Sequence, residues 1–484
     1  MANSMYLFLH LVYVIFSFFG ASRETFVFSG EPVVWRLSIM NEPYDVVIIG
    51  GGASGTSLLY TLAHYSTVPR VLLIEKYDKP GQVNSRASNN SQTLHVGDIE
   101  TNYPLEKVRQ VRPAALMLVR YAEMQPVAVR DAILFTMPKM VLAVGEHEVL
   151  VLEKRFSDIS PLFPDVHKID RDAIALIEPA VVAGRSPHVP ICALATLKGY
   201  AVDYERLAQS FVDEALRTRS EYSVQYGSEV TLIVREGSEY VIQIKGRAPV
   251  RARAVVVDAD SYSLYFAKQL GYGKQFSLIP IAGSFYFSKK ILNGKVYTVQ
   301  EPLLPFAAVH GDPDVCVSNV TRWGPTARFF PVLESRNLKT MIDYVRSSGL
   351  GRPRTWVSFF TILLEPIRFK YLLTNMLYEL PWIGKRMLVK NVQKIIPEMC
   401  ACDLKKAKGY GGMRLQRVDT TTHELQLGEG KIIGDNIIFN MTPSPGASVC
   451  LYNALRDAEH VVSFLGKNVQ FDKVRMQNDF GEVV

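Results

Sequence analysis

The sequence predicts an α/β fold, α+β overall, with a discontinuous Rossmann-like dinucleotide-binding domain plus an antiparallel-sheet domain with a helical cap. A strand, a glycine-rich turn and a helix follow one another at residues 45–66. A second strand, glycine turn and helix occupy residues 437–465, near the far end of the chain. A long insert rich in short apolar runs lies between them. We expect the two outer units to share one sheet and the insert to form a second domain.

The first unit has the residue pattern of a phosphate-binding turn. Asp45–Ile49 predicts a short buried strand, and Ala53–Ser66 predicts the helix that follows. Glycines at G-x-G-x-x-G spacing allow a tight turn, a close approach of backbone to a pyrophosphate, and helix–strand packing. The helix N-terminus adds free N–H groups and the positive end of its dipole. The predicted phosphate-binding residues are Gly50, Gly52, Ala53, Ser54 and Gly55.

A second predicted strand, Arg70–Ile74, ends in an acid. Glu75 lies 75 − 55 = 20 residues beyond the last glycine of the motif, the separation at which a carboxylate bonds ribose hydroxyls. We therefore predict cofactor contacts from Glu75 and the adjacent Lys76. The alternative is a glycine-rich turn that binds nothing.

Further elements follow from hydrophobic periodicity and from turn residues. The polar run Asn84–Asp98 predicts a loop. The predicted helices are Leu105–Glu123, Asp170–Ile177, Asp203–Arg217, a helical stretch over residues 338–395, and Ala447–Leu465. The predicted strands are Phe135–Val144, Ser223–Tyr226, Glu229–Arg235, Tyr240–Lys245, Ala252–Val257, Ser284–Ser288, Val296–Val299, Ala307–His310, Val315–Val320, Gly409–Leu415 and Ile437–Met441.

These elements define the expected domains. Ala252–Val257 is a β-branched run and is expected in the centre of the dinucleotide-binding sheet. That domain is assigned residues 40–110, 200–262 and 405–466, and the second domain residues 111–199 and 263–404. The tail, residues 467–484, is expected to be frayed.

Composition excludes some classes of function. The formal net charge of +7 is spread along the chain without a basic run, so nucleic-acid binding has no support. Mild attraction to acidic lipid or small anions fits better. The five cysteines are odd in number, and Cys400-Ala-Cys402 is too closely spaced for a zinc ribbon and lacks a second pair. We predict reduced thiols and no metal site.

The first 39 residues form an apolar extension. Residues 1–22 carry no charged side chain, and Met5–Ala21 is an apolar run just long enough to span a membrane. No basic segment precedes it, as one would in a signal peptide. Three interpretations remain open: an over-extended translation start before Met40, a membrane anchor through residues 5–21, and a cleaved signal.

A set of longer motifs, taken together with their order and spacing, resembles a known family. The motifs are residues 91–103 (SQTLHVGDIETNY), 262–268 (YSLYFAK), 271–286 (GYGKQFSLIPIAGSFY), 310–314 (HGDPD), 324–327 (GPTA) and 442–448 (TPSPGAS). They are similar to the malate:quinone oxidoreductases, within the wider group of flavoproteins that share a D-amino-acid-oxidase-like fold. The resemblance covers about residues 40–465.

This resemblance implies FAD as cofactor, oxidation of L-malate to oxaloacetate, and transfer of the electrons to a membrane quinone. It also implies peripheral attachment at the cytoplasmic face of the inner membrane. It leaves the oligomeric state open. The chain departs from the family pattern at Asp260, where the family strand typically continues with glycine. An Asp there adds bulk and negative charge beside the phosphates, which is expected to weaken FAD binding.

Oxidising a 2-hydroxy acid requires a base for the hydroxyl proton, in addition to the flavin as hydride acceptor. Histidine suits this role because its unperturbed pKa lies near neutrality. In related flavoproteins that oxidise 2-hydroxy acids, a histidine at the step corresponding to His310 lines the substrate pocket, so His310 is the first candidate. His95, in the polar loop, is the second. Either histidine could instead bond loop backbone.

The carboxylates of the substrate require cations, and the planar fork of arginine matches a carboxylate best. Arg322 and Arg414 are the candidates, with Lys139 as a weaker third. The polar loop is expected to contact the isoalloxazine edge or the ribityl chain, Val230 the adenine, and the closing turn the flavin pyrimidine. The predicted residues are Asn90, Ser91, Gln92, Thr93, Val230, Gly446, Ala447 and Ser448.

Residues 356–387 combine apolar side chains with interleaved cations and Trp382, a pattern typical of interfacial membrane-docking helices. A buried helical cap on the substrate domain is the competing interpretation. Two alternative functions also remain at this point. One is a related L-2-hydroxyacid dehydrogenase or oxidase, and the other is a flavoprotein-like membrane-associated binding protein that Asp260 leaves catalytically impaired.

Overall fold

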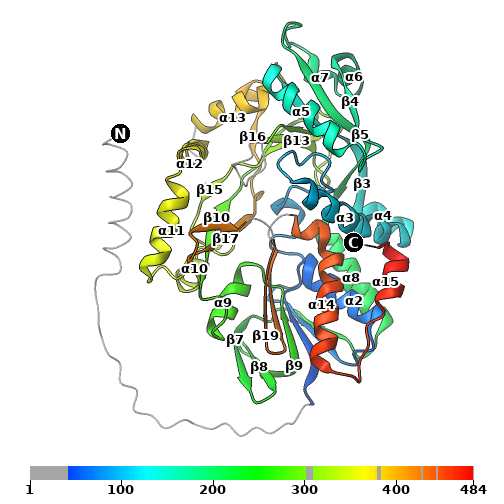
Figure 1. Ribbon diagram of the computed structural model, residues 1–484, viewed down its shortest axis with the longest axis vertical. Coiled ribbons are helices and arrows are strands. Elements are labelled where there is room, and N and C mark those ends of the chain that lie inside the picture. Colours follow the sequence, from blue (N-terminus) through cyan, green and yellow to red (C-terminus); the bar gives the residue numbers. More distant parts are fainter. Residues whose placement is uncertain (1–41, 301–308, 379–382, 427–428, 443–444, 483–484) are drawn as a thin grey trace. The chain divides into compact units, whose positions relative to one another are not determined.

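The computed structural model describes residues 42–300, 309–378, 383–426, 429–442 and 445–482. Residues from Pro43 onward form one compact unit, built on three β-sheets whose strands come from distant parts of the chain (Figure 1). The predicted α/β class is confirmed. The N-terminal extension and its possible anchor at residues 5–21 lie outside the described residues. Within the described ranges, no helix is both long and apolar enough to cross a bilayer.

The first sheet joins the two ends of the described chain. Its strands are β1 (Tyr44–Ile49), β2 (Val71–Ile74), β6 (Ser223–Gln225), β7 (Val230–Glu236), β8 (Glu239–Ile244), β9 (Val250–Val257), β19 (Gly430–Gly434) and β20 (Ile437–Met441). β9 pairs in parallel with β1 on one side and with β20 on the other. The prediction that both outer units return to one sheet, with residues 252–257 at its centre, is therefore confirmed.

Alternate residues of β1 pack on opposite faces of this sheet. Val46 and Ile48 pack with α2 (Ala53–Tyr65), which in turn contacts α8 (Tyr204–Thr218) and α14 (Cys450–Leu465). Val47 and Ile49 pack instead with residues of β8 and α9 (Ser261–Gln269). Since both faces are covered, the strand reads as a continuous apolar run rather than an alternating one.

The other two sheets are mainly antiparallel. The larger has the order β16-β11-β14-β13-β12-β3-β5-β4, and the smaller the order β15-β10-β17-β18. The strands of the larger sheet are β3 (Leu134–Val144), β4 (His167–Ile169), β5 (Ile191–Val202), β11 (Tyr286–Lys289), β12 (Lys295–Thr298), β13 (His310–Pro313), β14 (Val320–Gly324) and β16 (Lys405–Lys406). Those of the smaller sheet are β10 (Phe276–Ala282), β15 (Arg328–Phe329), β17 (Met413–Asp419) and β18 (Glu424–Gln426).

Further helices cover these sheets. They are α3 (Leu105–Met124), α4 (Val127–Ile133), α5 (Glu146–Ile159), α6 (Arg171–Ile177), α7 (Pro179–Val182), α10 (Thr340–Ser348), α11 (Pro353–Leu363), α12 (Pro366–Tyr378), α13 (Ile383–Gln393) and α15 (Lys473–Phe480). Short 3-10 turns occur at η1 (Ala87–Asn89), η2 (Ala401–Asp403) and η3 (Gly446–Val449). Asp203 caps α8, because its side chain accepts hydrogen bonds from the backbone N–H groups of Glu205 and Arg206.

Two predicted strands are wrong. Residues 315–319 form a loop, because the Asp314 carboxylate accepts hydrogen bonds from the backbone N–H groups of Cys316 and Val317 and so turns the chain. The strand begins only at Val320. The strand predicted at 409–415 is displaced to β17, which pairs with β10 rather than with the dinucleotide-binding sheet.

The frayed tail is also a wrong prediction. Helix α15 begins after Asp472, whose side chain caps it and whose backbone N–H donates to the Tyr65 carbonyl. Met476 and Phe480 are fully buried and pack in the same core cluster as α3. Tertiary packing thus stabilises a helix whose polar sequence gave little indication of one.

Candidate active site

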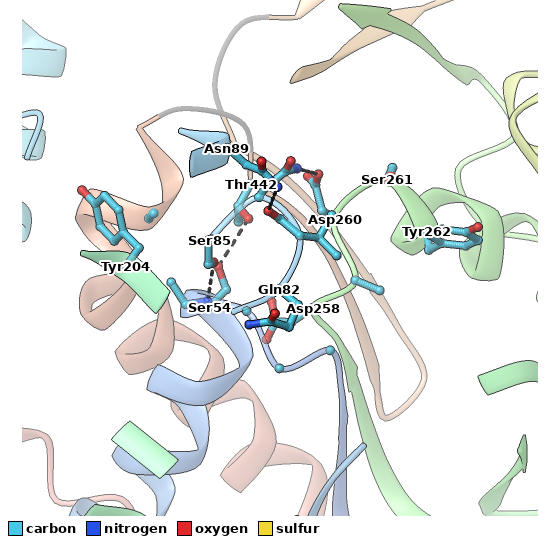
Figure 2. A pocket seen from close by; sticks show the side chains of 18 of the residues that line it. Ser54, Gln82, Ser85, Asn89, Tyr204, Asp258, Asp260, Ser261, Tyr262 and Thr442 are labelled. Atoms are coloured by element: carbon cyan, nitrogen blue, oxygen red, sulfur yellow. Dashed lines mark hydrogen bonds between the residues drawn. The ribbon is translucent and has the colours of Figure 1, made fainter. Parts of the chain in front are cut away.

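A large cavity opens at the carboxyl ends of four strands of the first sheet. Ile49 at the end of β1 and Glu75 after β2 line it, as do Asp258 after β9 and Thr442 after β20; the last two are seen in Figure 2. Its empty space is about 1570 Å³, a figure that includes the open solvent at its mouth. The carboxyl edge of an open parallel sheet is where such folds bind ligands, and this cavity extends there from the glycine turn to the polar loop at residues 90–93.

The glycine turn needs glycine for steric reasons. Gly50 has φ 114°, and a Cβ there would lie 2.4 Å from the carbonyl oxygen of Asp258. A Cβ at Gly55 would lie 2.0 Å from the carbonyl oxygen of Gly50. Gly50 and Gly52 line the cavity, whereas Gly55 lies behind them and allows helix α2 to pack against the turn. The turn therefore has the form of a phosphate site.

Side chains brace the N-terminus of α2. Its first turn carries no acid, so its positive dipole end is not offset. The Ser85 hydroxyl accepts a hydrogen bond from the Ala53 N–H at 2.9 Å, and the Ser54 and Thr442 hydroxyls lie 3.3 Å apart (Figure 2). Ala53 and Ser54 both line the cavity, as predicted.

Glu75 and Lys76 line the cavity, yet both have protein partners. The Glu75 carboxylate accepts hydrogen bonds from the N–H groups of Gly51 at 2.6 Å and Tyr77 at 2.9 Å, so it holds the glycine turn in place. Burial raises the pKa of Glu75. The Lys76 ammonium pairs with Glu334, and burial lowers its pKa. Glu334 also lines the cavity and was not predicted from the sequence.

The polar loop after η1 forms another wall. Asn90, Ser91 and Thr93 line the cavity, but Gln92 does not. Its amide N–H donates to the Ala87 carbonyl at 3.0 Å and to Asp314 at 3.1 Å, so Gln92 holds the loop from behind.

The turn before α14 meets this loop. Ala447 and Ser448 line the cavity, as does Val230 near the glycine turn, whereas Gly446 is not part of the lining. The Ser448 hydroxyl accepts from the His95 backbone N–H at 3.0 Å and lies 2.9 Å from the Tyr204 hydroxyl.

His95 lies in the cavity wall with a carboxylate behind it. Its Nδ1 is 2.5 Å from Oε1 of Glu100, and its Nε2 is 3.3 Å from the Ser91 hydroxyl. Burial acts to raise the pKa of Glu100, but the hydrogen bond from His95 and the nearby cations outweigh it, so the Glu100 pKa is lowered. An ionised Glu100 fixes a proton on Nδ1 and leaves Nε2 as the acceptor.

His310 occupies a different place. It is fully buried, stacks on Tyr297 with ring centroids 4.2 Å apart, and does not line the cavity. The Tyr297 hydroxyl lies 2.6 Å from the Thr93 hydroxyl. His310 is therefore linked to the cavity only indirectly among these contacts, through Tyr297 and the lining residue Thr93.

The two candidate arginines, like the two histidines, differ in whether they line the cavity. Arg322 is fully buried, pairs with Asp312 at 2.8 Å, and donates to the carbonyls of Asn90 at 3.0 Å and Ser91 at 2.7 Å. Lys295 also pairs with Asp312, at 2.5 Å. Burial acts to raise the pKa of Asp312, but Arg322 and Lys295 lower it to about 2. Arg322 thus supports the polar loop and does not face the cavity.

Arg414, in contrast, lines the cavity. Its guanidinium has no hydrogen bond or ion pair to any residue in the described part of the chain, and burial lowers its pKa. Lys139 pairs with Asp98 at 2.7 Å, is 1% exposed, and is not part of the lining. Arg414 is the candidate cation that remains available to an anionic ligand.

Several lining residues were missed by sequence reasoning, among them Asn84, Ser85, Tyr204 and Asp258. The first two stand in the predicted polar loop, so their position was the available signal. Away from the cavity, the described residues hold one group that could bind a metal ion, exposed Cys400, Cys402 and Asp403. There the Asp403 carboxylate accepts a hydrogen bond from the Cys400 N–H and caps a 3-10 turn.

Comparison with known proteins gives consistent results. The family model described as malate:quinone oxidoreductase matches residues 42–462. A probable malate:quinone oxidoreductase from Campylobacter jejuni is 40% identical over 442 residues, which cover 89% of this chain and 98% of that protein. A malate:quinone oxidoreductase from Helicobacter pylori is 39% identical over 441 residues, covering 90% and 97%.

Solved structures show the same fold at lower identity. An L-alpha-glycerophosphate oxidase from Mycoplasma pneumoniae with FAD bound has a TM-score of 0.62 at 17% identity, covering 90% of this chain and 97% of that one. A glycine oxidase from Geobacillus kaustophilus has a TM-score of 0.59 at 16% identity, covering 87% and 95%.

Proposed function

The chain belongs to the malate:quinone oxidoreductase family, and from this membership and the cavity we infer that it oxidises L-malate to oxaloacetate and passes the electrons to quinone. It is an FAD-dependent oxidoreductase. The observation that carries this function is a cavity at the carboxyl edge of the first sheet, beside the glycine turn, with an available arginine and a carboxylate-paired histidine in its walls.

The residues present fit FAD. A Cβ is sterically excluded at Gly50 and Gly55, which keeps the backbone of the turn open for a pyrophosphate. The N-terminus of α2 would face the phosphates, Glu75 a ribose, and Val230 the adenine. Residues 90–93 and the turn at 447–448 would contact the flavin end. When bound, FAD supplies the acceptor for the hydride that leaves C2 of malate.

We assign the base to His95 rather than His310. His95 lines the cavity, and Glu100 fixes its Nδ1 proton, so Nε2 can take the proton of the malate hydroxyl. Glu100 then stabilises the imidazolium that forms, as a positioning residue. His310 is buried and does not line the cavity; it stacks on Tyr297, whose hydroxyl lies beside that of Thr93.

Arg414 is the proposed ligand of a malate carboxylate. A partly buried guanidinium without a protein partner gains most from a bidentate anion. We withdraw Arg322 from this role, since Asp312 and two loop carbonyls already engage its N–H groups. Arg322 and Lys295 instead hold the carbonyl of Ser91, and with it the loop that carries His95.

The domain division stays a proposal. We place the first sheet and its helices in the FAD-binding domain, largely residues 40–110, 200–262 and 405–466. The other two sheets and α10–α13 form the substrate domain. Because β16, β17 and β18 pair with substrate-side strands, we move the last boundary from residue 405 to the start of β19 at Gly430.

Three consecutive helices carry the proposed membrane surface. α10, α11 and α12 follow one another along one edge of the compact unit (Figure 1). Each exposes an apolar stripe at helical spacing: Met341, Ile342 and Val345; Val357, Phe360 and Leu364; Phe369, Leu373 and Met376. Their opposite faces bury Tyr344, Phe359 and Ile362. The segment therefore caps the substrate domain on one face and leaves the other apolar.

Basic side chains surround this surface. Arg346, Arg352, Arg354, Lys370 and Arg386 are exposed on or beside the three helices. Apolar stripes with flanking cations suit an anionic bilayer. We propose that this surface docks the protein peripherally at the cytoplasmic face of the inner membrane, where quinone is available. Trp382 lies outside the described residues.

The function predicts a specific redox cycle. Purified yellow protein should lose its flavin absorbance when malate is added without oxygen, and a soluble quinone should restore the absorbance faster than air does. Absorbance spectroscopy in an anaerobic cuvette measures both steps. Bleaching by other 2-hydroxy acids but not by malate, or rapid peroxide formation in air without quinone reduction, would contradict this assignment.

Arg414→Met should raise the malate KM at least about 30-fold, since losing a charge-assisted pair costs about 2 kcal/mol or more. FAD content and the free energy of unfolding should change little. Arg322→Met is the matched comparison: it should destabilise the protein by about 3 kcal/mol, because Asp312 and two carbonyls lose their partner. Steady-state kinetics and denaturant unfolding separate the two. An unchanged malate KM in Arg414→Met would remove it from the site.

Glu100→Gln should lower kcat about 10- to 100-fold with little change in malate KM, because the group that orients His95 loses its charge. His95→Asn should abolish most of the activity, because the group that accepts the hydroxyl proton is lost. Stopped-flow bleaching of the flavin by malate provides the measurement. Bleaching at the unaltered rate in His95→Asn would assign the base elsewhere.

The triple variant Ile342→Glu, Phe360→Glu, Leu364→Glu should lose binding to vesicles containing phosphatidylglycerol, since three charges replace apolar contacts. Bleaching by malate should persist. Leu176→Glu, on α6 and 86% exposed, is the control and should bind as the unaltered protein does. Vesicle flotation measures binding. Equal flotation of the triple variant would place the docking surface elsewhere.

A further inference from the structure

The turn between β9 and α9 carries an acid directly beside the glycine turn. The Asp258 carbonyl fills the space that a Cβ at Gly50 would need, so the two turns are in contact. Asp258, Asp260 and Ser261 line the same cavity as Gly50 and Gly52 (Figure 2). Asp260 therefore lines the cavity two residues beyond the contact with the glycine turn, the turn suited to a pyrophosphate.

The backbone at Asp260 has a conformation that favours glycine. Its φ is 49° and its ψ −110°, a region that L side chains rarely adopt. Asp260 precedes α9, where an aspartate ordinarily caps the helix with its carboxylate. It makes no side-chain cap. Its Oδ2 instead accepts a hydrogen bond from the Asn84 amide at 2.6 Å, across the cavity wall. Neither helix capping nor backbone preference explains an acid here.

No cation compensates this carboxylate among the described residues. Of the charged side chains that line the cavity, Lys76 pairs with Glu334 and Glu229 with Lys245, and Glu75 is bound to the glycine turn. Asp258 accepts from Asn440, which also bonds Asp457, and Arg414 stands in the wall as well. Burial raises the pKa of Asp260 to about 6 and, with Asp457, that of Asp258 to about 7.

We propose that Asp260 makes FAD binding by this chain weak and dependent on pH, because its ionised carboxylate repels the pyrophosphate and its protonated form does not. The proposal rests on the FAD site described above. It identifies a residue that sets cofactor affinity without taking part in the chemistry of malate.

The direction of the pH effect follows from linkage. A bound pyrophosphate favours the protonated carboxyl, so FAD raises the pKa of Asp260 above its value in the free protein. FAD binding then takes up a proton at pH values between the two pKa values. The affinity should be constant below about pH 6 and fall as pH rises above it, by up to about tenfold per pH unit.

The test is an FAD titration of the full-length apoprotein between about pH 5.5 and 8.5, followed by quenching of flavin fluorescence. EDTA in the buffer prevents a divalent cation from bridging the carboxylate and the phosphates. At pH 8, Asp260→Asn should bind FAD at least about tenfold more tightly than the unaltered protein, and its affinity should vary less with pH than that of the unaltered protein. Asp260→Gly should do the same and also raise the apoprotein's melting temperature, because the φ strain is removed.

Asp131→Asn, an exposed carboxylate on α4, is the matched control and should retain the pH dependence. The proposal is overturned if the unaltered protein binds FAD equally across this range, or if Asp260→Asn keeps the dependence while Asp258→Asn loses it. Failure of both the unaltered protein and Asp260→Asn to bind FAD at any pH would instead overturn the FAD site itself.

Discussion

The close approach of two parallel strand ends, β1 and β9, fixes the geometry on which the site depends. Their pairing brings the Asp258 carbonyl to 2.4 Å from where a Cβ of residue 50 would lie, so only glycine is compatible with the contact. Since β2 and β20 flank the same pair, the chain segments that leave all four strands meet around one cavity. The same contact brings Asp260 into that cavity, beside the turn suited to phosphates.

A buried cluster of charged side chains holds the opposite wall of the cavity, the polar loop, in position. Asp312, Arg322 and Lys295 are fully buried, and the one carboxylate pairs with both cations while the cations also bind loop carbonyls. Removing such charges from water costs a large free energy. The cluster therefore contributes by specifying one arrangement of the side chains and the loop rather than by adding net stability. Here that arrangement fixes the loop carrying Thr93 and His95. Loss of one member would leave the others buried and unbalanced, so the loop and the cluster depend on each other.

Local patterns predicted one part of this site well and another part poorly. The glycine turn, Glu75, the polar loop and the closing turn were identified because short spacings specify their backbone conformations. The roles of Arg322 and Arg414 were not separable from sequence. Arg322 faces Asp312 across the β13–β14 pairing, and this register, set by an antiparallel contact, determines that its charge is already neutralised. Glu100, five residues after His95, was overlooked because nothing local indicates that the loop folds it back onto the ring.

The sequence by itself therefore determined the fold class, the phosphate-binding turn, and the return of the chain's far end to the first sheet, since each depends on backbone conformations that neighbouring residues specify. Only the tertiary structure decided which histidine and which arginine face the cavity, that residues 473–480 form a packed helix, and that α10–α12 keep an apolar face exposed. Those outcomes depend on burial and on charge compensation between residues far apart in the chain. The packing of the folded chain brings such residues together, and the neighbouring residues in the sequence do not indicate which pairs will meet.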